Sequence, residues 1–206
     1  MKTDVVKVSK TGMGMDDALS IAVSAAQYRG LDNKEALHIR LLAEEMMGMV
    51  YQIAGDTELE FWVESEDKEF ELHLVAYPKV TEKVRDELLK ASTSGHNEAA
   101  KGFMGKVRDI FNAALADKDM DDMSDYYAQG LILPNDMYMS DPMAYTTMTS
   151  VATWSLSNYK ESMDKDGSDE GWDELERSIV ANIADEVKIY IDKKKVEMIV
   201  YKKFDK

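Results

Sequence analysis

The chain has 206 residues, of which 40 are acidic and 25 basic, so its formal net charge is −15. This balance argues against non-specific binding to nucleic acid or to an anionic membrane, because the protein would repel phosphate groups. The absence of cysteine excludes disulfide scaffolds, thiol catalysis and thiolate zinc sites. No apolar run approaches the roughly 20 residues of a membrane helix, and the N-terminus lacks a signal-peptide core, so we expect a soluble, cytoplasmic protein.

The first part of the chain predicts a short strand and two helices. Residues 5–8 are rich in valine and end at the glycine-containing turn 10–14. Alanines at helical spacing follow, and Gly30 suits a helix C-cap. A second helix opens near Asn33 and ends at Gly55, because leucines and methionines recur between them every three or four residues.

The apolar period then switches to two. Apolar residues alternate with glutamates along 57–65 and again along 69–77, although Trp62 interrupts the polar side of the first run. Two such runs in succession predict an antiparallel hairpin with one buried face. The residues expected on that face are Phe61, Val63, Leu72 and Leu74.

The middle of the chain gives weaker signals. Helices are expected over 81–91, 99–115 and 143–163, the last around Trp154. The acidic stretch 117–142, which contains two prolines, is expected to be an insertion or a connector.

The C-terminal part predicts a helix over 172–186 and two strands, 187–192 and 196–204. Strands that neighbour in sequence, with helices segregated from them, are typical of the α+β class. We therefore expect a two-layer α/β sandwich whose mixed or antiparallel sheet is covered by helices on one face. The helices 33–54 and 172–186 should pack together on that face.

Few residues point to chemistry by their spacing alone. The three histidines, His38, His73 and His96, lack metal-ligand spacing, so a solvated or structural role is favoured and no metal site is expected. The glycines of residues 12–14 follow a strand and precede a helix, but Asp17 stands where a dinucleotide motif has its third glycine.

The methionines allow two interpretations. There are fifteen, spread over the expected helices, which is typical of adaptable core filling. The alternative is a methionine-rich groove for a partner around Met46, Met47 and Met49.

A candidate nucleotide- or anion-binding segment lies at 92–106. A turn rich in serine, threonine and glycine precedes an expected helix, whose free N–H groups attract anions, and two lysines lie nearby. In the alternative interpretation the glycines of this helix let another helix approach and the lysines are solvated. The candidate residues are Ser92, Thr93, Ser94, Gly95, Lys101, Gly102 and Lys106.

Two segments together resemble the GHKL (histidine-kinase-like) ATPase superfamily, which includes DNA gyrase, histidine kinases and anti-sigma-factor serine kinases. Residues 41–50, LLAEEMMGMV, resemble the helix that carries the family's N-box. Leu175 to Phe204 resembles the closing helix and hairpin of the anti-sigma kinases, and the hairpin at 57–77 follows in the same order. The resemblance implies a single domain over 1–206, with an enlarged lid region at about 80–165.

The ATP-binding boxes of that family are degenerate in this chain. In the N-box, E-x-x-x-N, the Glu aids the attacking water and the Asn binds Mg²⁺. Glu45 matches the Glu, but Met49 stands at the Asn position, and a thioether is a poor ligand for a hard cation. The D-x-G-x-G box that reads adenine is replaced by VAYPKV at 75–80, and the later glycine box is reduced to Gly171.

The resemblance therefore implies a regulatory protein with weak or lost ATP binding that acts by binding another protein, such as a sigma factor or another regulatory partner. The first alternative is an active ATP-binding serine kinase or ATPase, with Glu45 as base and Lys101 or Lys106 on the phosphates of Mg-ATP. The second is an unrelated small-ligand-binding α/β protein. No cofactor is firmly expected, and a homodimer is kept as an alternative assembly.

Overall fold

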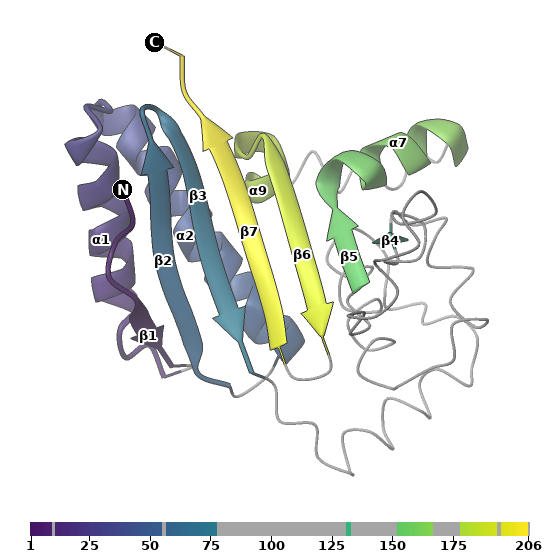
Figure 1. Ribbon diagram of the computed structural model, residues 1–206, viewed down its shortest axis with the longest axis horizontal. Helices are drawn as coiled ribbons and strands as arrows, with labels where there is room; N and C mark the ends of the chain where they lie inside the picture. The colour runs from purple at the N-terminus through teal and green to yellow at the C-terminus, as the bar shows by residue number, and fades with distance from the viewer. Residues whose placement is uncertain are drawn as a thin grey trace, which may run out of the picture.

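The computed structural model describes residues 1–9, 11–54, 57–77, 131–132, 152–166, 178–192 and 195–205. Within them, seven strands form one antiparallel sheet in the order β1-β2-β3-β7-β6-β5-β4 (Figure 1). The strands are β1 Val6–Val8, β2 Leu59–Glu66, β3 Glu69–Ala76, β4 Leu131–Ile132, β5 Ala152–Ser155, β6 Glu186–Asp192 and β7 Lys195–Lys203. The described helices are α1 Met15–Tyr28, α2 Asn33–Ala54, α7 Leu156–Asp166 and α9 Ile179–Ile183.

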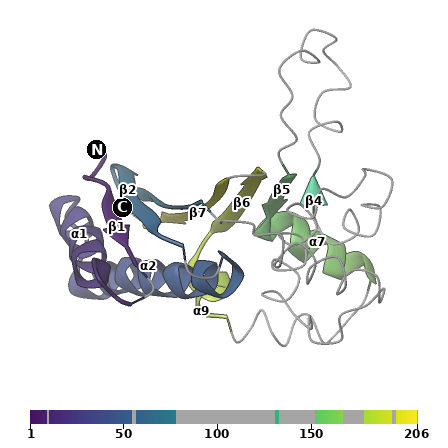
Figure 2. The same cartoon turned by 90° about the horizontal axis from the view of Figure 1, so that it is seen from below.

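Helices α1, α2 and α9 lie on one face of this sheet (Figure 2). The long helix α2 contacts α1 and α9 as well as strands β3 and β7. The expected α+β sandwich with helices on one face is therefore confirmed, and so is the packing of α2 against the C-terminal helix. The described residues place no helix over the central strands on the opposite face, called the open face below (Figures 1 and 2).

Cross-strand register explains which residues form the core. Phe61 lies opposite Leu74, which lies opposite Met198, and that residue lies opposite Ile189. All four are buried and point to the helix face, as the two-residue period requires. A parallel row holds Val63, Leu72, Val200 and Val187.

Local hydrogen bonds set the ends of the first two helices. Asp32 Oδ1 accepts from the backbone N–H groups of Lys34 and Glu35, both at 2.8 Å, and Glu35 Oε2 accepts from the Asp32 N–H at 2.9 Å. This reciprocal capping box starts α2. At the end of α1, Gly30 has φ +79° and donates to Gln27, which confirms the expected C-cap.

Two sequence expectations in the second half are wrong in part. Residues 152–155 form strand β5, not helix, because they pair with β6 from Ala152↔Ile191 to Ser155↔Lys188. Helix α7 starts only at Leu156 and continues to Asp166, beyond the expected end at 163.

The expected helix 172–186 is also too long at its C-terminal end. Helix α9 is capped by Ser178, whose hydroxyl accepts from the Ala181 N–H, and it ends at Ile183. Asp185 then donates its N–H to the carbonyl of Tyr201 on β7, so the chain is already joining the sheet. Residues 172–177 lie outside the described part.

None of the helices in the described ranges is both long enough and apolar enough to cross a membrane.

Candidate functional site

The N-box-like segment lies on α2, with Glu45 and Met49 one helical turn apart. Met49 belongs to the hydrophobic core and is only 6% exposed, whereas Glu45 is half-buried. The Met49 thioether therefore packs among apolar side chains. In the described part of the chain, no group of three histidine, aspartate or glutamate side chains is placed to hold a metal ion.

The neighbouring methionines also belong to the core. Met46 and Met47 are fully buried. The alternative of a methionine-rich partner groove at these positions and Met49 is therefore wrong, because none of the three side chains is accessible to a partner. The core-filling interpretation holds for them.

The other residues of the expected nucleotide or anion site lie outside the described part of the chain. Lys101 and Lys106 lie outside the described residues, and their interpretation stays a prediction. The same applies to Ser92, Thr93, Ser94, Gly95, Gly102 and Gly171, and to His96.

The open face carries a polar cluster that the sequence did not predict as a unit, and Trp62 and His73 lie at its centre. They are directly opposite in the β2–β3 register, and their rings stack with centroids 4.7 Å apart and planes 5° from parallel. His73 is 7% exposed, so of the two roles expected for it, solvated or structural, its burial agrees with the structural one. The stacked indole removes one ring face from water.

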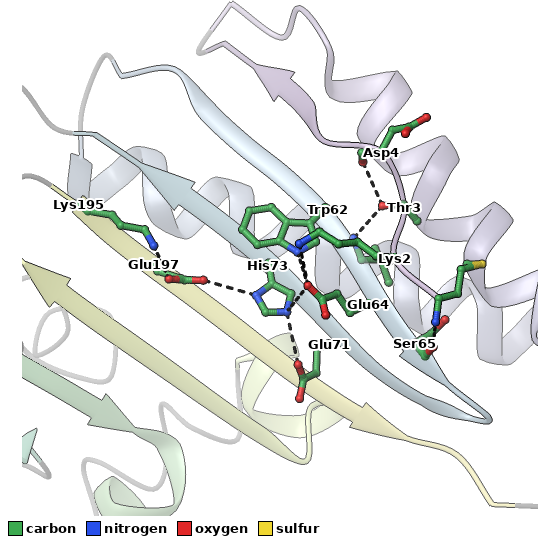
Figure 3. A network of polar contacts seen from close by, with 12 residues as sticks. Lys2, Thr3, Asp4, Trp62, Glu64, Ser65, Glu71, His73, Lys195 and Glu197 are labelled. Atoms are coloured by element: carbon green, nitrogen blue, oxygen red, sulfur yellow. Dashed lines mark hydrogen bonds and ion pairs between the residues drawn. The ribbon is translucent and has the colours of Figure 1, made fainter.

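Three glutamates from three strands surround the His73 ring (Figure 3). Its Nε2 lies 3.4 Å from Glu71 Oε2 and 3.9 Å from Glu64 Oε1, and its Nδ1 lies 3.6 Å from Glu197 Oε1. Within the described residues, neither ring nitrogen makes a hydrogen bond. We call Trp62, Glu64, Glu71, His73 and Glu197 the His73 cluster.

The Glu64 carboxylate is the best satisfied member of this cluster. Its Oε1 accepts from Lys2 Nζ and from Trp62 Nε1, both at 2.9 Å. The hydrogen bond from Lys2, followed by that from Trp62, lowers the pKa of Glu64 below its usual value. The Lys2 ammonium also lies 4.6 Å from the centre of the Trp62 ring, a cation–π distance.

A hollow of about 340 Å³ adjoins the cluster on the open face. Glu71, Tyr201 and Glu186 lie side by side across strands β3, β7 and β6, and their side chains form part of its wall. Lys188, Tyr190 and Ile199 complete the lining. Aromatic rings and carboxylates therefore alternate over this surface.

Two signals in the sequence pointed to the cluster. Trp62 is the one large apolar residue on the polar side of β2, and His73 occupies the polar side of β3. Only the register places them opposite each other, and the third strand, β7, arrives from more than a hundred residues later.

Comparison with known proteins finds no match: no family model, no curated protein and no solved structure is significantly similar to this chain.

Proposed function

We propose that this protein is a regulatory module of GHKL-like architecture that acts by binding another protein and has weak or no affinity for Mg-ATP. The order of elements supports the proposal: a strand, two helices, a hairpin, and later a short helix and a closing hairpin. The two hairpins join through β3 and β7 in one sheet, with α2 behind them. This is the arrangement that the resemblance implies.

The burial of Met49 is the observation that carries the proposal. It stands where the family's Mg²⁺-binding Asn is expected, and its side chain is in the core. A thioether is a poor ligand for a hard cation, and a buried side chain cannot turn outward without leaving a cavity. Glu45 alone would leave Mg²⁺ without its expected side-chain partner on α2.

Protein binding is tested with purified sigma factors and their regulators from the source organism, titrated against this protein without nucleotide. The family resemblance suggests these partners, and the proposal predicts that at least one forms a complex with the same affinity in the presence and absence of Mg-ATP. A complex that forms only with Mg-ATP would contradict it and favour the kinase alternative.

A further inference from the structure

The carboxylates of Glu64, Glu69, Glu71, Glu186 and Glu197 on the open face outnumber the ammonium groups of Lys2, Lys188, Lys195 and Lys203. Lys2 pairs with Glu64, Lys195 with Glu197, and Lys203 with Glu69. Among the described residues, the only ion-pair contact of Glu71 is with His73. The Glu71 side chain is 51% exposed. The face therefore keeps an accessible negative charge beside two aromatic residues, Trp62 and Tyr201.

His73 supplies a second observation, independent of the charge. A buried imidazole normally hydrogen-bonds through at least one nitrogen. Here both nitrogens are buried and lack such a partner within the described ranges, and they point into the ring of carboxylates (Figure 3). The two ring nitrogens of His73 therefore have no hydrogen-bond partner among the other residues of the cluster.

Lys2 indicates what kind of group fits this surface. Its ammonium lies over the Trp62 ring while Glu64 accepts its hydrogen bond. An indole face next to a carboxylate binds a cationic side chain through both contacts. Glu71 lies directly opposite Glu64 in the β2–β3 register. It is a second carboxylate, and it forms no ion pair with a described lysine.

We propose that the open face, centred on the His73 cluster, binds a lysine- or arginine-bearing segment of the partner protein. This inference rests on the proposed function and names the surface and the partner's chemistry. The basic side chains would take the place of Lys2 over Trp62 and reach Glu71 and Tyr201 at the edge of the hollow, which Lys188 also lines. The net charge of −15 would also attract a basic segment from a distance.

The probe is an acetylated, amidated tetralysine peptide, titrated into ¹⁵N-labelled protein at low salt. The largest shift is expected at the Trp62 indole N–H. The variant Glu64→Gln/Glu71→Gln should weaken the affinity by about ten-fold, because it removes the two accessible carboxylates of the cluster. The matched control Asp17→Asn/Glu44→Gln removes the same charge from exposed positions on α1 and α2, and should change the affinity by less than about two-fold because solvent and salt screen distant charges.

A second pair of variants tests whether Lys2 occupies the position that a basic side chain of the partner would take. Lys2→Met should strengthen tetralysine binding because it frees Glu64 and the Trp62 ring. Lys7→Met, which removes another exposed lysine, paired with Glu58 away from the cluster, should have a smaller effect. Equal effects within each pair, or shifts spread evenly over the protein, would overturn the proposal and leave only a general electrostatic attraction.

Different results would contradict the proposed function and the open-face inference. If a sigma factor or its regulator binds with unchanged affinity to the Glu64→Gln/Glu71→Gln variant, the open-face inference is wrong and the proposed function stands. If tetralysine binds as expected while Mg-ATP binds tightly, the proposed function is wrong and the basic-segment site stands.

Discussion

Gly14 allows the start of α1 to lie directly against β1. Its φ is +83°, and a Cβ placed there would lie 2.0 Å from the carbonyl oxygen of Lys7. The glycine is therefore required by both packing and conformation.

We predict that Gly14→Ala lowers the free energy of unfolding by more than about 2 kcal/mol, since it adds a backbone clash to the cost of a left-handed alanine. Gly30→Ala is the matched control, because Gly30 has φ +79° but nothing within 4 Å of its Cβ position. It should cost only about 1 kcal/mol. Equal losses in urea unfolding would show that the contact with Lys7 does not matter.

The Glu64 carboxylate predicts a pH dependence of stability. Its pKa is lowered in the folded protein, chiefly by the hydrogen bond from Lys2, so its contribution is present above the usual value of 4.5 and is lost as pH falls through the lowered value. The contribution is small because the side chain is 41% exposed and screened by solvent.

Lys2→Met should therefore reduce the part of the stability that is lost between about pH 5 and pH 3. Urea unfolding of both proteins at several pH values measures this. If the stability of the variant falls as steeply as that of the natural sequence, the Lys2 hydrogen bond is not the cause.

At the residue scale, the sequence predicted the buried face better than the polar one. Alternation was sufficient to assign Phe61, Val63, Leu72 and Leu74, all of which are fully buried. His73 was taken as solvated or structural because its strand position is polar, and its burial depends on a tryptophan across the strand pair. Such a contact requires the register, which alternation alone does not supply.

Among the elements, α2 connects the fold to the functional proposal. This 22-residue helix packs against α1, α9, β3 and β7, and one of its three core methionines, Met49, lies in the N-box-like segment. A polar residue at Met49 would have to be hydrogen-bonded inside this layer, where the surrounding core is apolar.

We predict that Met49→Asn, which introduces the Asn of the GHKL N-box, lowers the free energy of unfolding by about 2 kcal/mol because it buries an amide in place of a thioether. It should not create Mg-ATP affinity, since the adenine-reading box stays absent. Met49→Leu is the control and should cost less than about 1.5 kcal/mol. An Asn variant that keeps full stability and gains Mg²⁺-dependent ATP binding would contradict both the packing argument and the functional one.

The elements that the sequence predicted are those specified by their own periodicity. Helix α2 and the β2–β3 hairpin have long, regular patterns, and their bounds were close to the observed ones. Strand β5 has four residues, too few for a period, and its pairing partner β6 lies about thirty residues later. Helix α9 was overextended because the turn into β6 is set by bonds from Asp185 to β7.

On the scale of the whole molecule, one antiparallel sheet joins hairpins that are far apart in sequence. Strand β3 pairs with β7 from Glu69↔Lys203 to Ala76↔Val196, so the C-terminal hairpin lies beside the first one. Composition and alternation predicted the α+β class and the single sheet. They did not predict the outer strands β5 and β4, which depend on partners brought together only by the complete fold.

The two faces of that sheet have separate roles in our account. The helix face buries Met49 and supplies the core, and we propose that the open face, which carries the His73 cluster, binds the partner.

Calorimetric titration of Mg-ATP into the protein tests the proposed function most directly, with the same titration in EDTA as the reference. We predict no saturable heat at protein concentrations on the order of 100 μM, which places any dissociation constant in the millimolar range. A saturable, Mg²⁺-dependent isotherm with a micromolar dissociation constant would contradict the account and favour an active ATP-dependent enzyme.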